Sequence, residues 1–83
     1  MKDPLEAIPG VGPRVAAMLH DIGVHETRDL VGAEPEDLYQ RICSVRASRL
    51  DPCVLYTFRC AVYFASTAQP DPQKLKWWKW KNP

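Results

Sequence analysis

The sequence predicts an all-α fold, a compact bundle of five to six short helices, from three kinds of observation. Helix starts are marked by Asp3-Pro4, Asp51-Pro52 and Asp71-Pro72, in which a capping side chain precedes a proline suited to the first helical position. Apolar residues between these pairs recur at spacings of three and four, as on one face of a helix. Gly23 and Gly32 follow such runs, where glycine often ends a helix.

Four short helices are expected in the first half of the chain. The first covers residues 4–8 and ends before Pro9, because a residue that precedes proline avoids helical backbone. The second covers residues 13–22, and its buried stripe is Val15, Met18, Leu19 and Ile22. Thr27 caps a third over residues 28–31. The fourth opens at Pro35 among acidic residues that the helix dipole favours, and its stripe is Leu38, Ile42 and Val45, with Tyr39 at the margin.

The most apolar helix is expected over residues 52–66, after a polar connector. A helix that is apolar nearly all round lies at the centre of a fold, and Arg59 is its only charge. We expect Arg59 to reach the surface along its stem or to pair with an acid of the first half. These helices form one domain over residues 1–66.

Residues 67–83 are expected to form a linker and a Lys/Trp-rich helix that packs on the domain or extends from it. Leu75 and Trp78, three residues apart, are suited to docking on the domain. Lysines that alternate with tryptophans are also suited to lie along a sugar-phosphate backbone, where aromatic rings stack on bases. A third interpretation is an anchor at a membrane surface, although the segment lacks a broad apolar face.

Composition limits the class of protein. The 83 residues, 46% hydrophobic and 25% charged, suit one soluble domain, and neither a membrane-spanning run nor a secretory signal is recognised, so we expect a cytoplasmic protein without membrane contact. Three cysteines without a CxxC pair indicate reduced thiols, suited to core packing rather than to metal or redox chemistry. His20 and His25 lie five apart, the wrong spacing for two ligands on one helical face. We expect no metal and no cofactor.

Charge is distributed unevenly along the chain. Residues 1–40 hold three basic and eight acidic side chains, a net charge of −5, whereas residues 41–83 hold eight basic and two acidic, a net charge of +6. If the protein binds a polyanion, long-range attraction must therefore come from the second half.

The stretch 8–13, Ile-Pro-Gly-Val-Gly-Pro, has no side chain that can perform chemistry. Two glycines allow positive φ and close approach of another molecule to the backbone, while the prolines stiffen both ends. This composition suits a phosphate cradle; the alternative is a tight turn between two helices.

Two resemblances extend this interpretation. The pattern from Leu5 through Ile8-Pro9-Gly10-Val11-Gly12-Pro13, Ala16, Leu19 and Gly23 to Leu30 resembles a helix-hairpin-helix motif. The helix that follows Asp51-Pro52 and the Lys/Trp tail resemble the small bacterial pathogenicity-locus family, some members of which carry a mitomycin-resistance label. The helix-hairpin-helix resemblance implies a SAM-like fold in which residues 44–51 take the place of a second hairpin. This second hairpin would be degenerate, because the stretch lacks glycine.

The helix-hairpin-helix resemblance also implies which residues form a binding site and that the partner is DNA. The backbone N–H groups of Gly10, Val11, Gly12 and Arg14 would face phosphate oxygens of DNA, with Arg14 adding its charge. Secondary basic contacts are expected from the loop and the tail: Arg46, Arg49, Lys74, Lys76 and Lys79. Binding would be weak, independent of sequence and strongly dependent on salt.

Three functions follow for comparison. The first is DNA-backbone binding, in DNA repair or damage resistance, and the acidity of the first half argues against it. The second is a protein-interaction or self-association module without nucleic acid, because opposed charges suit head-to-tail contact. The third is an enzyme, either a base-excision glycosylase or a lyase using a lysine Schiff base, and neither is expected. A glycosylase of this kind needs a second helical domain, for which 83 residues leave no room, and no lysine lies beside the 8–13 stretch or in the apolar helices.

Overall fold

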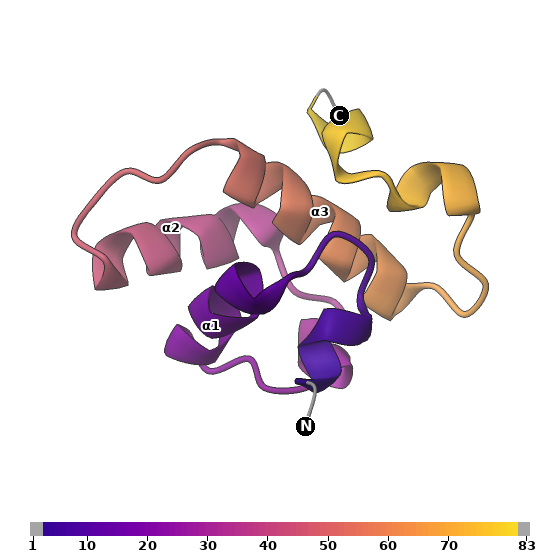
Figure 1. Ribbon diagram of the computed structural model, residues 1–83, viewed down its shortest axis with the longest axis horizontal. Helices are drawn as coiled ribbons and strands as arrows, with labels where there is room; N and C mark the ends of the chain where they lie inside the picture. The colour runs from indigo at the N-terminus through magenta and orange to yellow at the C-terminus, as the bar shows by residue number, and fades with distance from the viewer. Residues whose placement is uncertain (1–2, 82–83) are drawn as a thin grey trace.

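Three α-helices and four single-turn 3₁₀ helices make up the described part of the chain (Figure 1). The structure is a computed structural model that describes residues 3–81. Its elements are η1 (Pro4–Ala7), α1 (Pro13–Asp21), η2 (Thr27–Leu30), α2 (Pro35–Val45), α3 (Cys53–Ser66), η3 (Pro72–Leu75) and η4 (Trp77–Trp80). The all-α prediction is confirmed. The predicted number of five to six helices is wrong for α-helices, because the other four elements are each only one 3₁₀ turn long.

The first two elements pack their apolar residues into the core and leave the intervening turn at the surface. Asp3 caps η1 by accepting the N–H of Leu5 at 2.9 Å. In α1, Ala16, Met18 and Leu19 are buried, whereas Val15 is only partly buried. The helix ends in a Schellman motif in which Gly23 has φ 88 and the N–H of Val24 donates to Leu19 at 2.9 Å.

The caps of η2 and α2 differ from the predictions. Glu26, rather than Thr27, caps η2, because its side chain and that of Asp29 form a reciprocal capping box. In α2, Leu38 and Ile42 are buried as predicted, but Val45 is 57% exposed, which corrects its place in the stripe. After Val45 the chain turns away from the core, so the last turn of α2 leaves this side chain at the surface.

α2 ends in a second Schellman motif that uses no glycine. The N–H of Ser48 donates to Cys43 and that of Ala47 to Ser44, both at 3.1 Å. Ala47 occupies the left-handed position with φ 51 and is the only non-glycine residue with positive φ among those that the structure describes. Ser44 and Val45 therefore belong to α2, which corrects the predicted start of the 44–51 loop, and the left-handed Ala47 follows the end of the helix.

α3 is the central element, as predicted. It packs against α2, η2, η3 and η4, and it crosses the molecule between α1 and the C-terminal segment in Figure 1. Phe58, Cys60 and Ala61 are fully buried in it. The Arg59 guanidinium pairs with Glu36 at 3.0 Å, an acid of the first half, which confirms the predicted pairing.

The cysteines are free thiols that pack in or beside the core. Cys60 is buried, and burial raises the pKa of its thiol. Cys43 and Cys53 are half-buried.

Within residues 3–81, no helix has both the length and the apolar character needed to span a bilayer.

The C-terminal segment forms two 3₁₀ turns rather than the single predicted helix. Lys76 has extended backbone (φ −94, ψ 108) and separates η3 from η4. This break shifts the side chains that face the domain: Leu75, Trp77 and Trp80 are half-buried, whereas Trp78 is 56% exposed. Docking of Leu75 is thus confirmed, and docking of Trp78 is wrong.

Candidate functional site

The turn between η1 and α1 is held from both sides by buried residues. Ile8 is 1% exposed and Val11 is 5% exposed, so both anchor the turn in the core. Between them, Pro9 precedes Gly10 with φ 86, and the N–H of Val11 donates to the Ile8 carbonyl at 3.0 Å. These are the features of a type II turn, which requires positive φ at its third residue. The anchoring leaves Gly10 at the surface.

The four predicted N–H donors are not equivalent. Val11 uses its N–H to close the turn. The N–H groups of Gly10, Gly12 and Arg14 make no hydrogen bond to any residue between 3 and 81. Gly12 is the N-cap of α1, with extended backbone (φ −97, ψ −174), and its carbonyl accepts the first helical bond, from Ala16 at 2.9 Å. Two unpaired donors, at Gly12 and Arg14, thus lie at the positive end of α1.

The space around the two glycines differs. A Cβ added at Gly12 would meet no atom within 4 Å. A Cβ at Gly10 would lie 3.4 Å from Cδ1 of Trp77 and 3.7 Å from its Cβ. The C-terminal segment therefore lies beside the turn at Gly10, whereas the space around a Cβ at Gly12 is open.

The C-terminal segment is fixed to α3 by polar and aromatic contacts. The ring of Trp80 lies 5.3 Å from that of Tyr63, and its Nε1–H donates to the Lys74 carbonyl at 2.7 Å. Nη1 of Arg59 donates to the Trp80 carbonyl at 2.7 Å. The N–H of Asp71 donates to the Tyr63 hydroxyl at 2.9 Å. The segment is thus attached at both of its turns.

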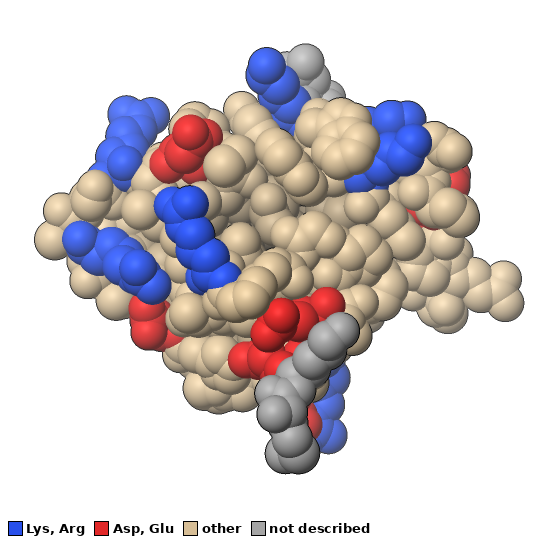
Figure 2. Space-filling model, viewed as in Figure 1, with Lys and Arg blue, Asp and Glu red and all other residues tan. Residues whose placement is uncertain are grey.

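The tail lysines predicted as secondary contacts lie on this docked segment. Lys74 places its Nζ 5.7 Å from the centre of the Tyr63 ring, a cation–π contact. Lys79 donates to the side-chain oxygen of Gln73 at 3.3 Å. Lys76 is half-buried between the two turns. Figure 2 shows basic side chains over the C-terminal segment at the top and upper right and a second basic group at the left. Acidic residues lie among the left-hand basic group, below it, and at the right edge beside the right-hand basic group.

Arg14 is exposed and lies near the start of α3. It lines a small pocket together with Asp51, Cys53 and Thr57. The pKa of Asp51 is lowered first by the N–H of Cys53, which donates to its carboxylate at 2.9 Å, and the charge of Arg14 lowers it further. Arg14, at the start of α1, thus lies near Asp51 at the end of the 44–51 loop.

The loop arginines are engaged with protein groups. Arg46 pairs with Asp21 at 2.8 Å, which joins the loop to the end of α1. Arg49 lies beside Tyr39, whose pKa is raised mainly by burial and then by Cys43, while Arg49 acts in the opposite direction. Arg46 is thus held in an ion pair within the protein, and Arg49 lies beside Tyr39.

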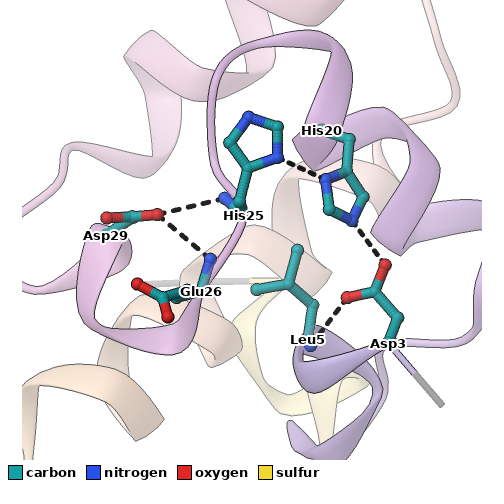
Figure 3. A network of polar contacts seen from close by, with 6 residues as sticks. All are labelled: Asp3, Leu5, His20, His25, Glu26 and Asp29. Atoms are coloured by element: carbon teal, nitrogen blue, oxygen red, sulfur yellow. Dashed lines mark hydrogen bonds and ion pairs between the residues drawn. The ribbon is translucent and has the colours of Figure 1, made fainter. Parts of the chain in front are cut away.

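A histidine network was not predicted from the sequence (Figure 3). Asp3 bonds Nε2 of His20, and the Nδ1 atoms of His20 and His25 face each other within hydrogen-bond distance. With the Nε2 proton of His20 directed at the carboxylate, its Nδ1 accepts from Nδ1–H of His25. Asp29 accepts the backbone N–H groups of His25 and Glu26 at 3.1 and 3.0 Å. The glycine that ends α1 was the available signal, because it turns the chain and brings His25 back beside His20.

Fold and surface together define a small all-α domain with a glycine turn at a helix start and a basic C-terminal segment docked beside it. The model of the pathogenicity locus family (Cdd1) matches residues 2–83, and the chain belongs to this family. The chain is also similar to a mitomycin resistance protein, McrB, of Streptomyces lavendulae, with 35% identity over 74 residues that cover 89% of this chain and 67% of the relative. No solved structure matches the chain.

Proposed function

We propose that this protein binds the sugar-phosphate backbone of DNA, without sequence preference, through the 8–13 turn acting as the hairpin of a helix-hairpin-helix motif. The observation that carries the proposal is the pair of unpaired N–H groups at Gly12 and Arg14, with open space in front of Gly12. Backbone donors at the start of α1 are suited to one or two phosphate oxygens, and the Arg14 side chain adds a positive charge.

The docked C-terminal segment supplies the positive charge that the acidic first half lacks. Residues 72–81 contain four lysines and no acid, and Trp77 of this segment contacts Gly10 of the hairpin. Several acids of the first half are already neutralised or capping: Glu36 pairs with Arg59, and Asp21 with Arg46. These two ion pairs offset part of the negative charge of the first half, although neither lies at the start of α1, where Asp51 is the acid near Arg14.

The name of the similar protein suggests the process in which this DNA binding would take part. That protein is named for resistance to mitomycin. We extend a role in damage resistance to this chain, as a binding protein and not as an enzyme.

Gly12 provides the sharpest test, because its substitution does not strain the fold. Its φ of −97 suits any residue, and a side chain would point into open space. We expect Gly12→Val to block the approach of phosphate and to weaken binding to a fluorescent duplex about tenfold at low salt, as the loss of one or two charge-assisted bonds implies. Gly12→Ala, a smaller obstacle at the same backbone, should have a smaller effect.

Gly10 is unsuited to this test, because its positive φ and the nearby Trp77 make any substitution there a test of folding. Circular dichroism and thermal unfolding of both Gly12 variants verify that the fold is kept. Absence of duplex binding by the wild-type protein even at low salt, or equal binding by Gly12→Val, would reject the proposal.

Self-association or protein docking is the second candidate. It is favoured by one observation: the exposed Val45 borders an open groove between α1 and α2, whose charged lining includes Asp21, Asp37 and Arg41. Size-exclusion chromatography at several salt concentrations tests it. A salt-sensitive oligomer without affinity for DNA would favour this function over the first.

A further inference from the structure

Trp78 is the most exposed of the three tryptophans. Trp77 packs against Gly10, and Trp80 packs against Tyr63. Trp78 is 56% exposed, and its ring meets that of Trp77 edge-on, with centroids 5.9 Å apart and an interplanar angle of 87°. The docked neighbours on both sides in the sequence hold Trp78 in place while its ring remains accessible to solvent.

The sequence on both sides of Trp78 is basic. Lys76 and Lys79 flank the Trp77-Trp78 pair, Lys81 follows, and no acid occurs between residues 72 and 81. In Figure 2 basic side chains lie on either side of uncharged surface over this segment. An exposed aromatic ring among cations is the arrangement that binds single-stranded nucleic acid, because each base has a face for stacking and each phosphate a charge to be neutralised.

Trp78 is also close to the hairpin. Trp77 lies between the two, because its Cδ1 is 3.4 Å from the position that a Cβ at Gly10 would take, and its ring centre is 5.9 Å from that of Trp78. We therefore consider a DNA strand that runs from a phosphate at Gly12 past Trp77 to Trp78. In a continuous duplex the bases are stacked on one another and are not available to an external ring.

We propose that Trp78 stacks on an unpaired base adjoining the duplex, so that the protein prefers DNA with a single-stranded extension over fully paired DNA. This inference rests on the proposed function and adds the form of the DNA to it. The observations favour DNA over a membrane surface, because Trp78 is a single exposed ring, whereas Leu75, Trp77 and Trp80 are turned toward the domain and offer no broad apolar face.

The test compares two fluorescein-labelled DNAs that share one duplex, one blunt and one with a four-nucleotide single-stranded extension. We expect the wild-type protein to bind the extended DNA about fivefold more tightly or better, as the stacking of one base implies. Trp78→Ala should remove this preference while blunt-duplex binding changes by less than about twofold. Trp78→Phe keeps an aromatic face and should keep part of the preference.

The outcomes separate the two proposals. If the wild-type protein binds both DNAs equally and Trp78→Ala changes neither, the inference about Trp78 is wrong while backbone binding stands. If it binds neither DNA, both are wrong. Binding of anionic phospholipid vesicles that is lost in Trp78→Ala, without a preference for extended DNA, would assign Trp78 to a membrane surface instead. Trp78 is exposed, so thermal unfolding should show both variants folded as the wild type is.

Discussion

Ala47 holds a backbone conformation that favours glycine. Its φ of 51 allows α2 to end in a Schellman motif, and its side chain is exposed, so no packing offsets the strain. We therefore expect Ala47→Gly to stabilise the protein by about 0.5–1 kcal/mol, since relief of the strain outweighs the added flexibility of the unfolded chain. Urea unfolding at neutral pH measures the change.

Gly23 supplies the matched control, since it occupies the corresponding position after α1 with φ 88 and open space around it. Gly23→Ala introduces the same strain and should destabilise by about 1 kcal/mol. Opposite signs at the two positions are expected. A loss of stability in Ala47→Gly would show that the strain at Ala47 is negligible.

Asp3 makes the stability of the fold depend on pH. The N–H of Leu5 and then the side chain of His20 lower the pKa of this carboxyl below its ordinary value. A carboxyl whose folded-state pKa is lowered stabilises the protein fully above its unfolded pKa, near 4, and loses this effect as the pH falls through the folded value. Asp3→Asn keeps a capping oxygen but lacks the charge.

The stability difference between wild type and Asp3→Asn should therefore shrink steadily as the pH falls below about 4. Urea unfolding at pH 7, 5, 4 and 3 tests this. Asp71→Asn is the control, since Asp71 caps η3 in the same way, through Gln73 at 2.9 Å, without a histidine contact within the described residues. A difference for Asp3→Asn that does not vary with pH would contradict the argument.

Between elements, Arg59 connects three parts of the fold. Its side chain, 16% exposed, leaves α3, pairs with Glu36 at the start of α2, and donates to the Trp80 carbonyl in η4. Arg59→Met keeps much of the stem but removes both contacts, so we expect a loss of about 1–3 kcal/mol. Glu36→Gln removes only the partly exposed ion pair and should cost about 1 kcal/mol or less.

Urea unfolding measures both variants, and tryptophan fluorescence reports on the docked segment separately. Arg59→Met should expose Trp80 and shift the emission to longer wavelength before global unfolding. If both substitutions cost the same, the bond to Trp80 contributes nothing, and the C-terminal segment docks through its aromatic contacts alone.

At the level of helices and turns, some features could be predicted from the sequence and others could not. The central position of α3 can be predicted from its own residues, because nearly every side of this helix is apolar. The capping residues and glycines likewise predict most helix boundaries. Val45, Trp78 and the break at Lys76 were predicted wrongly because periodicity assumes that a helix continues and that a neighbour covers its face. The bond between His20 and His25 and the contact of Trp77 with Gly10 join residues through turns, and a spacing rule for one helix does not detect them.

At the scale of the whole molecule, folding brings the basic half of the chain to the acidic half. Arg46 pairs with Asp21 and Arg59 with Glu36, so these charges hold the fold together. Of the lysines in residues 72–81, Lys74, Lys79 and Lys81 are exposed and Lys76 is half-buried, and within that segment no acid occurs. Attraction toward a polyanion should therefore depend on the C-terminal segment more than on the net charge of +1.

Replacing the tail lysines tests this. The triple variant Lys74→Gln, Lys76→Gln, Lys79→Gln should bind duplex DNA more weakly at low salt, and the slope of log K against log salt should flatten by about 0.9 for each phosphate that the variant no longer neutralises. The matched control replaces the pair Asp21→Asn with Arg46→Gln and keeps the net charge; because that pair is satisfied internally at 2.8 Å, the slope should stay as in the wild type. Fluorescence anisotropy between about 20 and 200 mM salt measures both, a range over which phosphate contacts respond strongly. An unchanged slope in the triple variant would show that the tail lysines do not neutralise DNA phosphates. A flattened slope in the control would show that the loop residue Arg46 does so instead.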